Sequence, residues 1–162
     1  MITNYLSPVS FKLIIDRLPN TEFFTQRVNL PQLSMASPQQ ASPIHNLYQT
    51  PDRIEYTDLD LSFIVDENMA NYHEILQWME GMGTPQSTDQ RADLDASRHG
   101  ARSDISVIIE NSARNANIRF TFTECFPTAL SGVALDITNS DVIHPECNVT
   151  FRYNNMTFEK IG

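Results

Sequence analysis

Acidic side chains gather in one short stretch of the chain, TDLDLSFIVDEN. Asp58 and Asp60 lie in its strand-like part, and Asp66 and Glu67 follow that part directly. Paired carboxylates can act as general acid and base or bind a divalent cation. The alternation places Asp60 on the face opposite the leucines beside it, which is the face expected to meet solvent. This exposure weakens the case for a catalytic pair.

Asp66 has a structural interpretation as well. It stands where strand alternation gives way to helical spacing, so its carboxylate can accept amide protons from the first helical turn. Glu67 suits the positive end of the helix dipole. We therefore interpret Asp66 as a helix cap rather than a catalytic residue.

Other catalytic chemistry has little support in the sequence. Cys125 and Cys147 lack the context of a nucleophile and lie in strand-like segments, so we expect them to be buried small hydrophobes. The four histidines have no ligand spacing, and no Gly-rich phosphate loop or nucleophile elbow is present. We expect no cofactor, no metal site and no enzymatic activity.

Size and charge narrow the class of protein. With 162 residues, the chain is long enough for one well-cored domain, which we predict to span 1–162. Twenty acidic residues against eleven Lys and Arg give a net charge of −9, which argues against binding nucleic acid through a basic patch. The N-terminus has neither a secretory signal nor a membrane anchor, so we expect synthesis in the cytoplasm.

Period-two alternation predicts that most of the chain forms strands. The predicted strands cover 11–15, 22–30, 54–65 with a bulge near Thr57 and Asp58, 105–110, 117–123, 147–154 and 156–158. The first two, separated by a turn at 18–20, are interpreted as a hairpin. Helical spacing from Met69 to Met79 predicts one helix that packs on the sheet, with Gly81 and Gly83 placed to end it. The fold class is therefore mainly β, an antiparallel sandwich or open barrel with one flanking helix.

Two long polar segments interrupt this pattern, at 31–53 and 83–103. Loops of this length inside a compact domain are uncommon and are usually functional or disordered. The first is rich in proline and carries apolar residues that a solvated loop would not need: Leu33, Met35, Ile44, Leu47 and Tyr48. We predict that both segments contact another molecule, with a solvated surface insertion as the alternative.

Three stretches carry a resemblance to a known family. The first is FKLIID followed by FFTQRVNLPQL (11–33), and the second is LDLSFIVDENMANYHEILQWM (59–79). The third is FPTALSGVALDITNSD followed by CNVTFRYNNMTF (126–158). In this order they resemble the tail tube protein of T-even-like contractile bacteriophages, a family related to the tube proteins of contractile injection and type VI secretion systems.

The resemblance implies a structural virion protein with a tail-tube-like fold. Such subunits stack as hexameric rings whose strands join into a continuous inner β-barrel, through which DNA passes during genome ejection without specific binding. The implied partners are further copies of the chain, the tail sheath and the baseplate, and the implied location is the virion tail, assembled in the host cytoplasm. We expect the segment 31–53 to bury its apolar residues against another subunit, and negative charge in the lumen to repel DNA.

Three other interpretations stay open. The chain can be a tube-like baseplate initiator or a tail terminator, which forms one ring and then stops. It can belong to a contractile injection or type VI secretion system. A carbohydrate-binding β-sandwich is the alternative from a different class, and it requires exposed aromatic side chains on one face.

Overall fold

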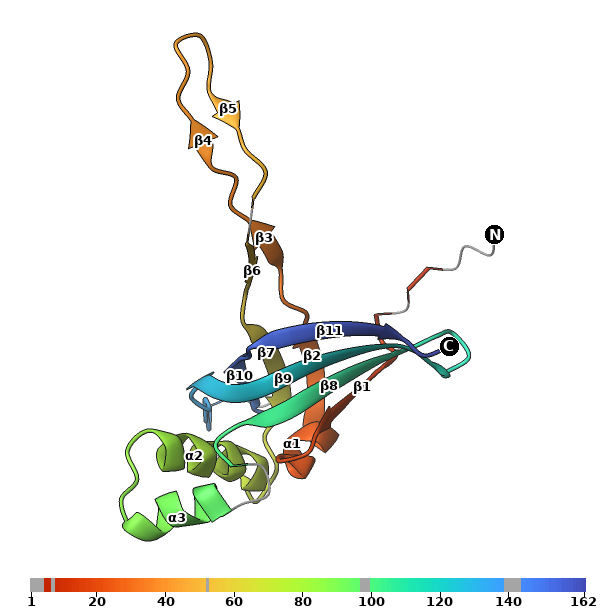
Figure 1. Ribbon diagram of the computed structural model, residues 1–162. Coiled ribbons are helices and arrows are strands. Elements are labelled where there is room, and N and C mark those ends of the chain that lie inside the picture. The colour runs from red at the N-terminus through yellow and green to blue at the C-terminus, as the bar shows by residue number, and fades with distance from the viewer. Residues whose placement is uncertain (1–4, 7, 52, 97–99, 139–143) are drawn as a thin grey trace.

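The computed structural model describes residues 5–6, 8–51, 53–96, 100–138 and 144–162 (Figure 1). The strands are β1 (Phe11–Ile15), β2 (Thr25–Asn29), β3 (Leu33–Met35), β4 (Gln39–Gln40), β5 (Leu47–Tyr48), β6 (Ile54–Tyr56), β7 (Leu59–Ile64), β8 (Ser103–Glu110), β9 (Ala116–Leu130), β10 (Glu146–Arg152) and β11 (Asn155–Lys160). The helices are α1 (Pro19–Phe24), α2 (Ala70–Met82) and α3 (Thr88–Ala96). None of these helices is long and apolar enough to cross a membrane.

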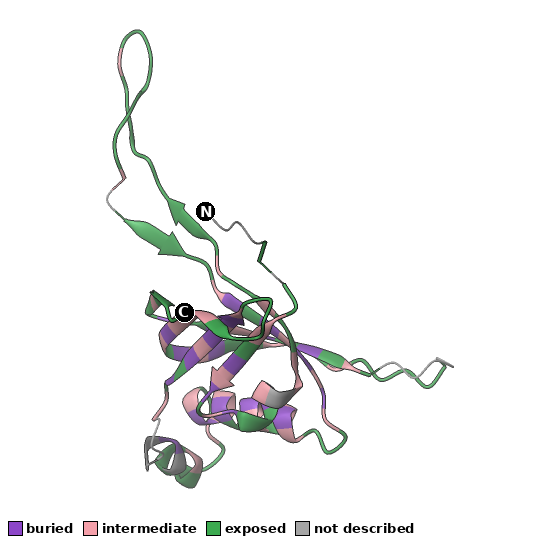
Figure 2. Cartoon of the chain, turned by 90° about the vertical axis from the view of Figure 1, so that its right-hand side faces the viewer, coloured by how far each residue is buried: buried purple, intermediate pink, exposed green. Residues whose placement is uncertain are grey.

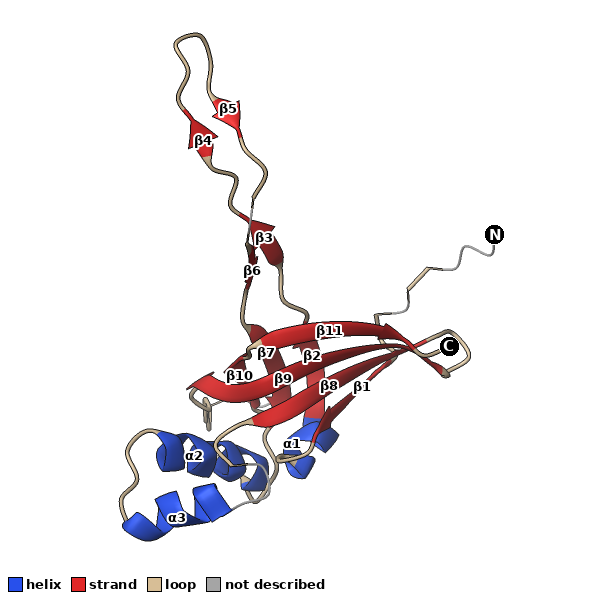
Figure 3. Ribbon diagram, viewed as in Figure 1, coloured by secondary structure: helices blue, strands red, loops and turns tan. Residues whose placement is uncertain are grey.

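Seven of the strands form the body of the molecule. Their order is β1-β8-β9-β10-β7-β2, with β11 paired to β9, and every pairing is antiparallel. The long strand β9 belongs to two four-stranded halves, one with β1, β8 and β11 and the other with β10, β7 and β2. Figure 3 shows one half lying in front of the other, with the helices at one end. The predicted mainly β, antiparallel class is confirmed.

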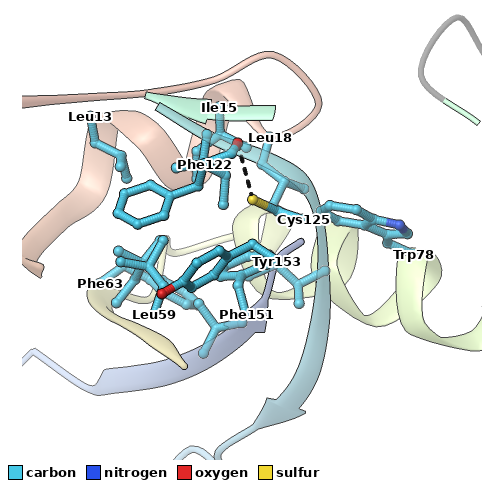
Figure 4. Close-up of a cluster of buried hydrophobic side chains, with 14 of the residues drawn as sticks. Leu13, Ile15, Leu18, Leu59, Phe63, Trp78, Phe122, Cys125, Phe151 and Tyr153 are labelled. Carbon is cyan, nitrogen blue, oxygen red and sulfur yellow. Dashed lines mark hydrogen bonds between the residues drawn. The ribbon is translucent and has the colours of Figure 1, made fainter. Parts of the chain in front are cut away.

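The core lies between the two halves and follows from the alternation of the strands. In β8, every second residue from Ser103 to Ile109 is buried, and β7 and β10 alternate in the same way. Buried side chains from both halves meet in one cluster, which Figure 4 shows around Phe122 and Phe151. The predicted break near Thr57 and Asp58 separates β6 from β7.

Helix α2 packs against this core, as the sequence predicted. Trp78 is only 1% exposed, its ring centroid lies 5.9 Å from that of Phe151, and its indole nitrogen donates a hydrogen bond to the Ala101 carbonyl at 2.9 Å. The helix ends at Gly83, whose amide donates to the Met79 carbonyl at 2.9 Å. The predicted end at Gly83 is therefore confirmed, whereas Gly81 lies inside the helix and is buried.

The predicted N-terminal hairpin is wrong. Strand β1 pairs with β8, and β2 pairs with β7, so the two strands are not partners. Between them Leu18 and Thr21 are both buried, and Glu22 donates its amide to the Leu18 carbonyl at 3.0 Å. Buried residues three positions apart are typical of a helix rather than a strand. Residues 22–24, which were predicted to begin the second strand, therefore belong to α1.

The two segments predicted as loops both contain secondary structure. One of them contains a helix, so the prediction of a single helix is also wrong. The segment 83–103 contains α3, and Leu94 of this helix is 4% exposed. Its side chain lies 3.6 Å from the position that a Cβ would take at Gly81, so α3 is tied to α2. The segment 31–53 contains β3, β4 and β5, and forms a long arm together with β6 (Figure 1).

Asp66 does not cap α2, contrary to the prediction. The cap position is Met69, whose φ of 53° is left-handed and whose side chain makes no capping hydrogen bond. Instead, Asn71 joins strand to helix: its amide nitrogen donates to the Ile64 carbonyl at 2.7 Å, and its side-chain oxygen accepts the Asp66 amide at 3.2 Å and the Tyr72 amide at 2.8 Å. Asn71 is fully buried, so these bonds replace water at the junction.

We predict that Asn71→Ala destabilises the protein by about 1 to 3 kcal/mol, because buried backbone groups lose their partners. Asp66→Ala should change the free energy of unfolding by less than about 0.5 kcal/mol, since its side chain makes no capping bond. Urea denaturation of both variants measures the difference. Equal losses would contradict the assignment of the junction to Asn71.

Candidate functional site

The acidic residues of the stretch 58–67 lie along β7 and beyond both of its ends, and they are not gathered into a catalytic site. Asp58 accepts a hydrogen bond from Arg152 Nε at 2.8 Å, and Asp60 accepts one from the Thr150 hydroxyl at 2.7 Å. Asp66 lies beyond the other end of β7. Within the described ranges, no group of three or more His, Cys, Asp or Glu is arranged to hold a metal ion.

The two cysteines are free and buried, as predicted. Burial raises the pKa of the Cys125 thiol to about 12, and it also raises the pKa of Cys147. The Cys125 thiol donates to the Phe122 carbonyl at 3.3 Å, drawn as a dashed line in Figure 4. Protonated thiols inside the core are structural groups, not nucleophiles.

The most distinctive feature of the molecule is the arm formed by residues 31–56. Its lower part is the pair β3 and β6, with Leu33 opposite Tyr56 and Met35 opposite Ile54, and its outer part is the pair β4 and β5. Figure 2 shows the arm projecting from the body with almost all of its length exposed. Such a two-stranded ribbon is marginally stable by itself, because it has no sheet or helix to pack against.

The composition of the arm is unusual for a segment surrounded by water. Residues 31–51 contain no Asp, Glu, Lys or Arg. Ile44 is 90% exposed, and Tyr48 is 70% exposed. An exposed tract that is both uncharged and apolar is typical of a surface that another protein covers.

The base of the arm is fixed by contacts with Tyr153, the residue that follows β10, and by hydrogen bonds between Thr57 and Gln32. The Tyr153 hydroxyl donates to the Thr57 carbonyl at 2.9 Å, and the Tyr153 ring packs edge-to-face on Tyr56 at 6.1 Å. The Thr57 amide donates to the Gln32 carbonyl at 3.1 Å, and the Gln32 amide donates to the Thr57 hydroxyl at 2.8 Å. The direction of the arm is therefore set where the chain leaves the body.

Burial holds Tyr153 in its neutral form. The pKa of its phenol is raised to about 12, chiefly because burial disfavours the phenolate, with further contributions from Tyr56 and Asp58. The neutral phenol is the form that donates to Thr57.

The predicted contact residues lie along the arm rather than in one patch. Leu33 and Met35 lie near its base, Leu47 and Tyr48 lie further out, and Ile44 lies in the turn between β4 and β5. The structure adds two residues to this set, Ile54 and Tyr56, which are 45% and 39% exposed. Both residues belong to the predicted strand 54–65, because their alternation runs into that of β7.

The structure combines a seven-stranded antiparallel body with an exposed arm, and shows no metal cluster among the described residues. Residues 10–159 match the family model described as phage tail tube protein. The chain belongs to the phage tail tube protein family, whose members are structural proteins and not enzymes. No curated protein sequence matches it.

Solved structures with the same fold come from contractile injection systems. A chain of the anti-feeding prophage cap structure, the tube-terminating cap, matches with a TM-score of 0.71 and 12% identity over 99% of this chain and 95% of that chain. A chain of the anti-feeding prophage baseplate matches at 0.66, with 15% identity over 98% and 97% of the two chains. A chain of the PVC sheath-tube complex in its extended state matches at 0.62, with 13% identity over 97% and 93%.

We predict that stability falls as the pH rises from about 10 to about 12. The pKa of Tyr153 is raised in the folded protein, so its contribution is fully present below the ordinary value of 10 and is lost as pH approaches 12. Urea denaturation at several alkaline pH values measures the slope. In Tyr153→Phe the slope should be smaller, and an unchanged slope would contradict the role of this phenol.

At neutral pH, Tyr153→Phe should cost about 1 kcal/mol, because the Thr57 carbonyl loses its donor. Tyr56→Phe is the matched control. Its ring stays in contact with Tyr153 while no hydroxyl-to-backbone bond is removed, so the free energy of unfolding should change little.

Proposed function

We propose that the chain is a subunit of the inner tail tube of a contractile bacteriophage tail. It polymerises as stacked rings of six copies, and the tube is a conduit for DNA ejection. The observation that carries this proposal is the arm, which projects from the body (Figure 2); its residues 31–51 include no Asp, Glu, Lys or Arg, and large hydrophobic side chains such as Ile44 and Tyr48 are exposed along it. Family membership supports the same conclusion.

The arm fits the contact that a tube requires. A tube grows by repeating one heterologous contact, in which a surface of one copy meets a different surface of the next. An arm that reaches beyond its own subunit, with Leu33, Met35, Ile44, Leu47 and Tyr48 along it, supplies one side of such a contact. Burying these side chains removes apolar surface from water, which stabilises the assembled state.

The charge of the protein suits a conduit for DNA. A net charge of −9 repels a polyanion, so a lumen that carries part of this charge lets DNA pass without holding it. Sheath and baseplate proteins are the proposed partners, since the same fold occurs in a sheath-tube complex and in a baseplate. Assembly takes place in the host cytoplasm, and the product is part of the virion tail.

A second candidate is a tube-like ring at one end of a tail or of a contractile injection system. The similarity to chains of a tube-terminating cap and of a baseplate favours it. Negative-stain electron microscopy of the purified protein distinguishes the two, because a tube subunit forms long tubes and an end protein forms discrete rings. Carbohydrate binding cannot use the one tryptophan, since Trp78 is buried.

Deletion of residues 37–45 should prevent polymerisation and leave a folded monomer. The deleted residues lie in the outer arm, are exposed except for the half-buried Ser42, and contribute no side chain to the core cluster. Electron microscopy measures tube formation, and circular dichroism with gel filtration measures the folded monomer. Unaltered tubes would show that the arm is not the contact.

Single substitutions refine this test. Ile44→Ser should weaken polymerisation, because the exposed apolar side chain no longer has surface to bury. Gln40→Ser, also in the outer arm, is the matched control and should polymerise normally. Equal effects of the two substitutions would argue against apolar burial as the driving force.

A further inference from the structure

Two segments of the chain pass directly from one half of the body to the other, with no helix between the strands that they join. One is the bend of β9 at Glu124, and the other is the link of Tyr153 and Asn154 between β10 and β11. The two segments lie against each other, because the Asn154 amide donates to the Thr123 carbonyl at 3.1 Å. These direct links therefore meet at one place, which we call the corner (residues 123–124 and 153–154).

The backbone of the corner is strained at Glu124. Its φ of 56° is one that residues other than glycine rarely adopt, and such a conformation persists only where surrounding contacts hold it. Asp104 accepts the Glu124 amide at 3.0 Å, and Arg102 pairs with the Glu124 carboxylate at 2.8 Å. The side-chain amide of Asn154 donates to the same carboxylate oxygen. Strain that is held by several polar contacts points to a function for this residue.

The other residue of the link, Tyr153, contacts both the four-stranded half that contains β11 and the base of the arm. Its ring packs edge-to-face on Phe122 of β9, with the ring centroids 5.0 Å apart (Figure 4). The same ring lies 6.1 Å from that of Tyr56 in the arm, and its hydroxyl donates to the Thr57 carbonyl at 2.9 Å. A continuous series of contacts thus runs from the arm through Tyr153 and Asn154 to the bend.

The covalent attachment of the arm is to the opposite half. The arm leaves the body between β2 and β7, which pair with each other, and Asp58 beside its base accepts a hydrogen bond from Arg152 of β10 at 2.8 Å. Apolar packing holds the two halves together, but this packing is non-directional. Hydrogen bonds have a preferred geometry, so those of the corner can fix the direction of the arm relative to β8 and β11.

Stability of the core does not account for the contact between Asn154 and Glu124. Both residues are exposed, so neither side chain needs a partner to replace lost water. Exposed polar pairs of this kind contribute little to the free energy of unfolding. The contact can therefore be removed without unfolding the protein, and what it changes is the geometry of the corner.

We propose that the hydrogen bond between Asn154 and Glu124 fixes the direction of the arm, and that both are positioning residues for assembly. The inference rests on the proposed assembly through the arm. A repeating assembly requires the same angle between the arm and the body in every copy. If the arm samples several directions, the protein concentration needed for assembly rises by the inverse of the fraction of copies in the correct one.

The first test measures the direction of the arm in the unassembled subunit. Spin labels at Ser34→Cys in β3 and Thr157→Cys in β11 report the distance between the arm and the half that contains β11. Both positions are exposed, whereas the native cysteines are buried. Double electron–electron resonance should give a narrow distribution of distances in the labelled protein. Asn154→Ala should broaden or displace this distribution.

Asn148→Ala is the matched control for Asn154→Ala. Asn148 is also exposed, and its side chain accepts a hydrogen bond from the Ser62 hydroxyl at 2.5 Å, but this bond lies within one half of the body. The control should leave the distances unchanged and should assemble normally. Asn154→Ala should raise the concentration needed for assembly by about tenfold if about one copy in ten keeps the correct direction. Light scattering measures that concentration.

An exchange of donor and acceptor tests whether the two residues act as a pair. Asn154→Asp places a second carboxylate beside Glu124, so the distances should broaden and assembly should need more protein. Adding Glu124→Gln supplies a donor again, and this double variant should recover both the narrow distribution and the native assembly concentration. The exchange also keeps the proposal testable if Asn154→Ala fails to fold.

Three results would overturn the inference while the proposed function stands. They are unchanged distances in both Asn154 variants, equal effects of Asn154→Ala and Asn148→Ala, and a double variant that recovers nothing. Normal assembly of Asn154→Ala despite broadened distances would also overturn the role in assembly. A native protein that forms no rings or tubes would instead contradict the proposed function, and the distances, which are measured without assembly, would still decide whether the hydrogen bond directs the arm.

Discussion

The bend in β9 is the constraint on which the rest of the structure depends. This strand pairs with β8 and β11 in its first part and with β10 in its last part, so it must turn between two sheets that pack face to face. The turn falls at Glu124, whose φ of 56° lies in the left-handed region that residues other than glycine rarely adopt. Asp104 accepts the Glu124 amide at 3.0 Å, and Arg102 pairs with its carboxylate at 2.8 Å, so the bend is held from β8 and its flank.

This bend also determines which strand edges have no partner within the sheet. Strand β9 belongs to both halves and joins them around the core at one side only. The sheet therefore keeps free edges at β1, β2 and β11. The arm adds to this set, because β2 and β7 pair in the body and the chain between them continues outward as a ribbon. The core satisfies its own packing, while the strand edges and the arm lie outside it.

The sequence predicted those strands and the helix in which apolar residues recur at one constant spacing over many residues. Strands such as β8 and β10 alternate cleanly, and the stripe that includes Trp78 identifies α2. Prediction failed where a short segment makes a tertiary contact: Leu18 and Thr21 are buried by a helical turn, whereas the sequence predicted a hairpin turn at 18–20 and a strand from residue 22. It also failed at Asn71, because an asparagine among helical residues gives no sign that it bonds to the preceding strand. The apolar residues of the arm were recognised as unexplained, but their arrangement along a ribbon depends on pairings that no local pattern encodes.

A chain with open edges and an apolar arm risks uncontrolled association, and the structure limits that risk by restricting where pairing can occur. Glu22 and Asn155 occupy one amide on each edge, so a foreign strand finds only a short run of open groups. The arm carries its apolar residues one or two at a time along its length, so no broad hydrophobic patch is exposed at one place. Each contact is therefore weak when made alone, and a stable assembly requires several to form together. The proposed ring would fulfil this condition, because ring closure forms the last contact at no further cost in orientational freedom.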